Sequence, residues 1–152
     1  MDTPKILEIE AAMQLQKSPQ EVFEAIANPS EMSNYFISES SGRMESGAEL
    51  IWKFPEFEGE VPIRMGEVRQ DEYISYFWKN GTRELFVEMT IRQISTNSCV
   101  LTVTEKNMPN DAHGIKWLQE NTFGWANFLD CLKAYLEFDI NLRKGSFDFK
   151  KK

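Results

Sequence analysis

The longest amphipathic pattern of the chain runs from Asp111 to Phe138 and predicts one long C-terminal helix. At about 100° per residue, two mainly apolar stripes lie side by side along this helix. The first stripe consists of Leu118, Thr122, Trp125, Leu129, Leu132 and Leu136, and the second of Trp117, Asn121, Gly124, Phe128 and Tyr135. A helix with so wide an apolar face must cover a large apolar surface, and the strands predicted upstream can supply it.

Alternation of apolar and polar positions predicts strands over most of the preceding sequence. The first strand is expected at about 5–16, and six more at about 38–45, 48–54, 61–70, 73–79, 84–95 and 98–107. Glycine, proline and asparagine separate the later segments at hairpin spacing, which favours an antiparallel meander. The last two of these segments alternate most regularly, and Thr96-Asn97 between them predicts a hairpin turn.

Two short helices are expected between the first strand and the meander. Ser18 is placed to cap the first of them, with Pro19 at its first helical position and Glu21 completing a capping box. Asn28-Pro29 ends that helix and begins a second, which runs to about Phe36.

Composition and charge limit the classes of function. With 152 residues, 41% of them hydrophobic, the chain fits a single domain over 1–152. A net charge of −7 disfavours nucleic acid as a partner. The sequence also shows neither a basic-then-apolar leader nor a long apolar run, so we expect no membrane insertion and a cytoplasmic location. The tail at 139–152 has weak periodicity and is expected to wrap the surface or to be partly disordered.

Residues that commonly carry catalysis or bind metals are few and scattered. Cys99 and Cys131 are expected to be free buried thiols, with a disulfide as the open alternative. His113 is the only histidine and is predicted to be an exposed residue at the start of the long helix. We therefore expect no metal site, no cofactor and no assigned catalytic residue, since phosphate-binding, nucleophile-elbow and zinc motifs are also absent from the sequence.

The order of strand, two short helices, antiparallel strands and one long helix is the helix-grip arrangement of the α+β class. Particular residues also carry a family likeness, namely Ser18-Pro19-Gln20-Glu21-Val22-Phe23-Glu24-Ala25-Ile26, Asn28-Pro29, Tyr35-Phe36, Trp78 and Gly124-Trp125. In these the chain resembles the START-like (SRPBCC, Bet v 1-like) superfamily, and most closely the branch named after the activator of the heat-shock-protein ATPase. Members of that branch often carry Trp-Phe in place of Tyr35-Phe36, and the tail here is longer and more basic than the family pattern needs.

The resemblance implies a curved antiparallel sheet of about six or seven strands around the last helix, and a cavity between them. In many members this cavity holds a lipid, sterol, polyketide or other apolar molecule. The second helix stripe and the bulky inward strand positions are the expected wall, because methionine and aromatic side chains make an adaptable apolar pocket. The predicted ligand-binding residues are Tyr35, Phe36, Trp52, Phe54, Met65, Trp78, Met89, Trp117, Asn121, Gly124, Phe128 and Tyr135.

Several alternatives stay open at this point. The same bulky side chains would equally fill a solid core. Gly124 is costly inside a helix, which indicates either a bound molecule or a strand backbone close to it. Gly66 predicts a bulge that would turn Arg64, Glu67 or Arg69 inward, although such residues more often lie on the outer face.

We expect non-catalytic binding of a small apolar or amphipathic, lipid-like molecule. The first alternative is a protein-interaction module like the ATPase activator, with a protein partner. The second is a cyclase-like or dehydratase-like enzyme, which would need a polar group on the cavity wall; the candidates are Arg64, Glu67, Asn121, Tyr135 and His113. No oligomeric state is predicted.

Overall fold

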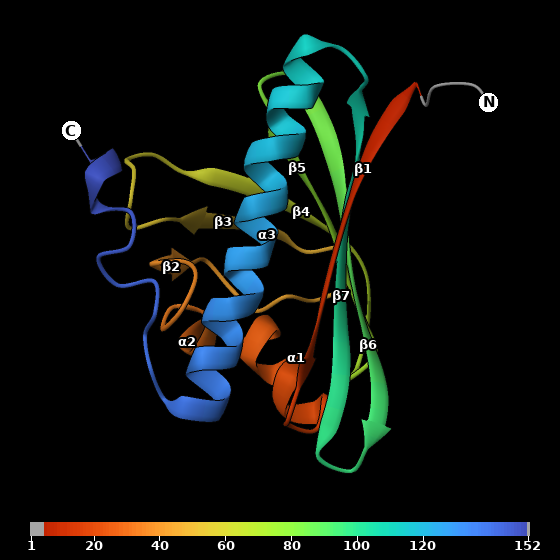
Figure 1. Ribbon diagram of the computed structural model, residues 1–152, viewed down its shortest axis with the longest axis vertical. Coiled ribbons are helices and arrows are strands. Elements are labelled where there is room, and N and C mark those ends of the chain that lie inside the picture. Colours follow the sequence, from red (N-terminus) through yellow and green to blue (C-terminus); the bar gives the residue numbers. More distant parts are fainter. Residues whose placement is uncertain (1–4, 152) are drawn as a thin grey trace.

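A seven-stranded antiparallel sheet bends around one long helix in the computed structural model, which describes residues 5–151 (Figure 1). The elements are β1 (Ile6–Leu15), α1 (Pro19–Ala27), α2 (Pro29–Met32), β2 (Glu39–Ser40), β3 (Glu49–Lys53), β4 (Val61–Arg69), β5 (Tyr73–Asn80), β6 (Arg83–Ser95), β7 (Ser98–Pro109), α3 (Ala112–Phe138) and the 3₁₀ turn η1 (Asp148–Lys150). The strand order is β1-β7-β6-β5-β4-β3-β2. This is the expected α+β helix-grip fold.

Capping residues explain where the helices begin and end. The Ser18 hydroxyl accepts a hydrogen bond from the Glu21 N–H, and the Glu21 carboxylate accepts one from the Ser18 N–H, which confirms the capping box. At the start of α3, Asp111 Oδ1 accepts a hydrogen bond from the Gly114 N–H. The helix ends at Asp139, whose φ of 52° turns the chain away from the helix axis.

The second strand is much shorter than the expected 38–45. Its backbone pairs with β3 only around Glu39–Ser40, and the Ser40 hydroxyl then donates to the Gly42 carbonyl and turns the chain. Further along, the Met44 N–H donates to the Ala27 carbonyl of α1 instead of to a strand. The segment therefore leaves the sheet because its backbone finds partners on the helix.

The predicted bulge at Gly66 is present, as a shift in the β4–β5 register between Met65 and Val68. A Cβ atom at Gly66 would lie 2.5 Å from Ser75 Oγ, so any other residue here would force the Ser75 hydroxyl to move from its hydrogen bond with the Glu67 carbonyl. The bulge does not turn charged side chains inward. Arg64, Glu67 and Arg69 keep exposed fractions of 52%, 62% and 49% and form ion pairs on the outer face.

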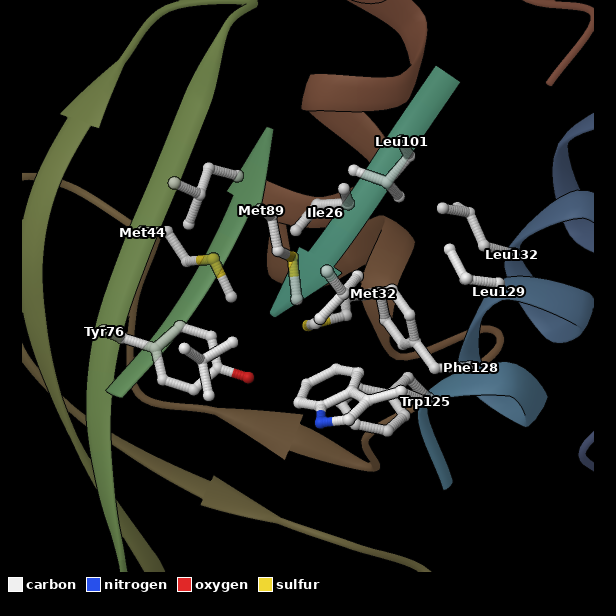
Figure 2. Close-up of a cluster of buried hydrophobic side chains, with 14 of the residues drawn as sticks. Ile26, Met32, Met44, Tyr76, Met89, Leu101, Trp125, Phe128, Leu129 and Leu132 are labelled. Atoms are coloured by element: carbon white, nitrogen blue, oxygen red, sulfur yellow. The ribbon is translucent and has the colours of Figure 1, made fainter. Parts of the chain in front are cut away.

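The core fills the inner part of the grip with large side chains (Figure 2). Trp125, Phe128, Leu129 and Leu132 of α3 point from one side toward residues of α1, α2 and the sheet on the other. Both cysteines are buried and free, as expected.

Two buried tyrosines of this core differ in how their hydroxyls are satisfied. The Tyr35 hydroxyl donates to the Ala25 carbonyl at 2.9 Å, whereas the Tyr76 hydroxyl, seen in Figure 2 pointing into the core, has no partner among the described residues. Tyr35→Phe should therefore cost about 1 kcal/mol of the free energy of unfolding, because it removes a made hydrogen bond. Tyr76→Phe should leave that free energy unchanged or raise it, because it removes an unpaired polar group. Urea unfolding of the two variants at neutral pH compares them directly.

Because of the same two tyrosines, we expect the free energy of unfolding to fall at high pH. Burial raises the pKa of Tyr35 and the pKa of Tyr76 well above the ordinary value of about 10. Above that value the unfolded chain loses these protons while the folded chain keeps them, so the free energy of unfolding falls as the pH rises. Between about pH 9 and about pH 11, we expect the free energy of unfolding to fall more steeply for the wild type than for Tyr76→Phe. Equal slopes for the two proteins would contradict this prediction.

Candidate functional site: a cavity between the long helix and the sheet

A cavity of about 380 Å³ lies between the middle of α3 and one end of the sheet. Its size falls in the range of small-molecule sites in proteins. Its wall consists of Phe36, Phe54, Glu56, Phe57, Val61, Trp78, Lys79, Asn80, Leu85, Glu105, Glu120, Asn121, Phe123, Gly124, Trp125, Asn127, Arg143, Phe147 and Lys150. Several of these side chains reach solvent, including Phe57 and Phe123, with exposed fractions of 54% and 61%. The cavity therefore has a mouth.

Five of the twelve predicted ligand-binding residues line this cavity. They are Phe36, Phe54, Trp78, Asn121 and Gly124. The other seven lie elsewhere, at Tyr35, Trp52, Met65, Met89, Trp117, Phe128 and Tyr135. Whether any of the twelve contacts a ligand stays a prediction.

The seven residues away from the cavity pack against one another and against the core. Phe128 is fully buried, with its ring centroid 4.8 Å from that of Phe36. Tyr135 stacks on Tyr35 at 5.4 Å and hydrogen-bonds through its hydroxyl to Glu31. The inner part of the grip is thus filled by side chains, and open space is left near the middle of α3.

The cavity wall does not follow the second stripe of α3, which was the expected wall. Trp125, from the first stripe, is buried and also lines the cavity, whereas Trp117 and Phe128 from the second stripe are buried in the core. The cavity faces only about two turns of the helix, from Glu120 to Asn127. Whether a residue of α3 lines the cavity therefore depends on its position along the helix as well as on the face of the helix that carries it.

Gly124 has open space where its side chain would be. A Cβ atom there would meet no atom within 4 Å, so neither a strand backbone nor a packed side chain explains the glycine. Gly124 is exposed and lines the cavity, so the open space beside it belongs to the solvent-accessible part of the cavity.

The central polar group of the cavity wall is Glu105 of β7, which is fully buried. Its Oε2 accepts a hydrogen bond from Trp78 Nε1 at 2.7 Å. Its Oε1 accepts from Asn121 Nδ2 at 3.0 Å and from Trp125 Nε1 at 2.9 Å. One carboxylate thus fixes three side chains of the wall, from β5 and from α3, by charge-assisted hydrogen bonds.

A second buried carboxylate lies at the mouth. Glu56 Oε1 accepts a hydrogen bond from Arg143 Nε at 2.6 Å, and both side chains are largely buried, with exposed fractions of 7% and 15%. The Arg143 guanidinium also packs over the rings of Phe36, Phe54 and Phe147. Arg143 belongs to the segment after α3, which runs past β2 and β3 in Figure 1 (dark blue). The described part of the tail therefore contributes Arg143, Phe147 and Lys150 to the cavity wall.

The chemistry available on the wall is limited. Its described residues include no serine, cysteine or histidine, so acid or base work would fall to a carboxylate or a lysine, of which the wall holds Glu56, Glu105, Glu120, Lys79 and Lys150. His113 is exposed, and its Nε2 lies 3.4 Å from Asn80 Oδ1 near the rim. Within residues 5–151, no three histidine, cysteine or carboxylate side chains are grouped so that they could hold a metal ion. No helix among these residues has the length and apolar character needed to cross a membrane.

Two glycines of α3 should respond to alanine in opposite ways. Gly124→Ala should raise the free energy of unfolding by up to about 1 kcal/mol, because the methyl group meets open space and alanine favours the helix. Gly114→Ala should lower it by about 1–3 kcal/mol, since its Cβ would collide with the Pro109 carbonyl oxygen. Thermal and urea unfolding measure both, and a destabilised Gly124→Ala would contradict the open space assigned to that position.

The fold recurs in solved structures. SSP2350 from Staphylococcus saprophyticus is 27% identical, with a TM-score of 0.78 over 90% of this chain and 96% of that one. The Aha1 dimer from Colwellia psychrerythraea is 15% identical, with a TM-score of 0.75 over 87% of this chain and 97% of that one. DynU16, a putative protein in the dynemicin biosynthetic locus, is 20% identical, with a TM-score of 0.78 over 88% of this chain and 48% of that one. The last two likenesses show the fold alone.

No curated protein matches the chain. The family model described as "Activator of Hsp90 ATPase homolog 1-like protein" matches residues 16–137, which is most of the sequence and leaves out the tail after α3. Together with the helix-grip fold, this match shows that the chain belongs to the family of activator of Hsp90 ATPase homolog 1-like proteins, within the Bet v 1-like superfamily.

Proposed function

We propose that this protein binds a small apolar or amphipathic, lipid-like molecule in the cavity between α3 and the sheet, without catalysing a reaction. The observation that carries the proposal is the open cavity walled by the rings of Phe36, Phe54, Trp78 and Trp125. Aromatic walls with a few fixed polar groups are typical of small-molecule sites. Gly124 is consistent with this proposal, because it costs the helix about 1 kcal/mol relative to alanine and leaves open space on the cavity wall.

The proposed contacts are the five predicted residues on the wall together with Trp125. The seven predicted residues that lie away from the wall belong to the hydrophobic core or pack against it, and they support the wall without contacting the ligand. A cytoplasmic location and a single domain over the full length stay predictions from the sequence.

The experiment is to block the cavity from the helix. Gly124→Leu puts a side chain into the open space, and we expect it to abolish binding of the neutral dye Nile red, followed by its fluorescence. The matched control is Ala126→Leu, which adds a leucine of the same size at an exposed position two residues away that does not line the cavity. Equal dye affinity of the Gly124→Leu variant and the wild type would refute the site. Native mass spectrometry of the purified protein would then identify a bound molecule by its mass.

An enzyme of the cyclase or dehydratase kind is supported less well. Of its five candidate polar groups, Asn121 alone lies on the wall, and its amide is already hydrogen-bonded to Glu105. An amide does not exchange protons at neutral pH as an acid or base must. A protein-interaction role, by analogy with the ATPase activator for which the family is named, is the other alternative, and the exposed rings of Phe123, Phe138 and Phe149 are the surface features that would favour it.

A further inference from the structure

The mouth of the cavity already holds a cation, and that cation comes from the chain itself. Arg143 hydrogen-bonds to Glu56 and lies 5.1 Å from the centroid of the Phe36 ring and 5.0 Å from that of Phe147. A carboxylate combined with aromatic faces is the arrangement by which proteins recognise organic cations. The contacts of Arg143 thus show what chemistry this part of the wall accepts.

Two carboxylates of the cavity wall are buried, those of Glu56 and Glu105, and Arg143 beside Glu56 is 15% exposed. The other charged side chains of the wall, those of Lys79, Glu120 and Lys150, are exposed. Glu105 receives its hydrogen bonds only from uncharged N–H groups, and Glu56 Oε2 is buried with no partner among the described residues. A buried carboxylate favours a cation beside it because the low dielectric strengthens their attraction. The buried part of the wall therefore has an unused acceptor, Glu56 Oε2, beside the site that Arg143 occupies.

Arg143 lies on a segment that little else holds in place. For the described residues 141–151, the other side-chain hydrogen bonds and ion pairs join members of the same segment, such as Ser146 to Leu142 and Lys151 to Asp148. The family model also ends before this segment, at residue 137. Apart from the contacts of Arg143, the hydrogen bonds, ion pairs and ring contacts between these residues and the rest of the described fold reduce to the ring contact of Phe147 with Phe123 of α3, so few interactions oppose a displacement of Arg143 from the mouth.

We propose that the cavity takes an organic cation, an amine or guanidinium group on an apolar body, and that Arg143 occupies the place of this charged group until the ligand displaces it. The inference rests on the proposed function and deepens it, since it names the charge of the ligand. The apolar body lies against Trp78 and Trp125, and the cation takes the position of the Arg143 guanidinium on Glu56.

The first experiment compares three probes of nearly equal shape on the wild-type protein, by isothermal titration calorimetry. The probes are naphthylmethylamine, naphthalenemethanol and naphthylacetate, which are cationic, neutral and anionic at neutral pH. We expect the amine to bind about tenfold more tightly than the alcohol, and the carboxylate most weakly. Equal or tighter binding of the alcohol or the carboxylate would overturn the inference and leave the proposed function standing. If neither these probes nor Nile red binds, the proposed function itself fails.

The second experiment removes the internal competitor. Arg143→Gln should raise the affinity for the amine about tenfold, whereas Lys144→Gln, the same change of charge at the exposed neighbouring residue, should leave it unchanged. Glu56→Gln should abolish the advantage of the amine over the alcohol. If Arg143→Gln and Lys144→Gln bind the amine equally, Arg143 does not occupy the place of the ligand's cation, and the inference is wrong.

Discussion

Phe128→Ala should lower the free energy of unfolding by about 3–5 kcal/mol, the range for a large aromatic ring removed from a packed core. Phe128 is fully buried, and its ring lies within 5.9 Å of three other rings, those of Tyr35, Phe36 and Trp125. It joins α3 to the segment that follows α2, so its loss opens a void at the junction of two elements. Urea unfolding with linear extrapolation measures the effect.

Phe123→Ala is the matched control, with the same change on the same helix. Phe123 has an exposed fraction of 61%, and its truncation should alter the free energy of unfolding by no more than about 0.5 kcal/mol. A loss below about 1 kcal/mol for Phe128→Ala, combined with weaker Nile red binding, would return Phe128 to the cavity wall that the sequence predicted for it.

The element order was predictable because it depends on local signals. The capping box at Ser18, the two-residue turn after Ser95 and the wide apolar face of α3 each lie within a short stretch of chain. These signals gave the order of elements, and that order led to the helix-grip fold. The shortened β2 was missed because its partner for Met44 is the Ala27 carbonyl, which alternation within a strand cannot reveal.

The cavity wall was predictable only in part. Helical angle gives the direction of a side chain, but the space in front of it depends on residues far away in the sequence. Phe128 and Gly124 lie on one stripe, yet the first faces Tyr35 and Phe36 whereas the second faces open space. The Glu56–Arg143 pair joins residues 87 positions apart, and no local pattern connects them.

The burial of Glu105, in contrast, follows from the alternation of its own strand. Cys99, Leu101 and Val103 point inward from one strand, and alternation places Glu105 on the same face. A glutamate at the inward end of such a series indicates a buried carboxylate that needs donors. The sequence could therefore have predicted the central polar group of the cavity, although not the two tryptophans and the asparagine that bind it.

Glu105→Ala should lower the free energy of unfolding by about 2–4 kcal/mol, because it leaves the N–H groups of Trp78, Asn121 and Trp125 without their acceptor. Glu105→Gln should lose less, since its amide oxygen still accepts from α3, and Glu10→Ala, an exposed glutamate of β1, should change the free energy by no more than about 0.5 kcal/mol. The Glu105→Ala protein should also bind Nile red more weakly, because no acceptor then holds the indole rings of Trp78 and Trp125 in place on the wall. Urea unfolding and dye titration measure both effects. A Glu105→Ala protein as stable as the wild type and with the same dye affinity would mean that this carboxylate does not organise the cavity.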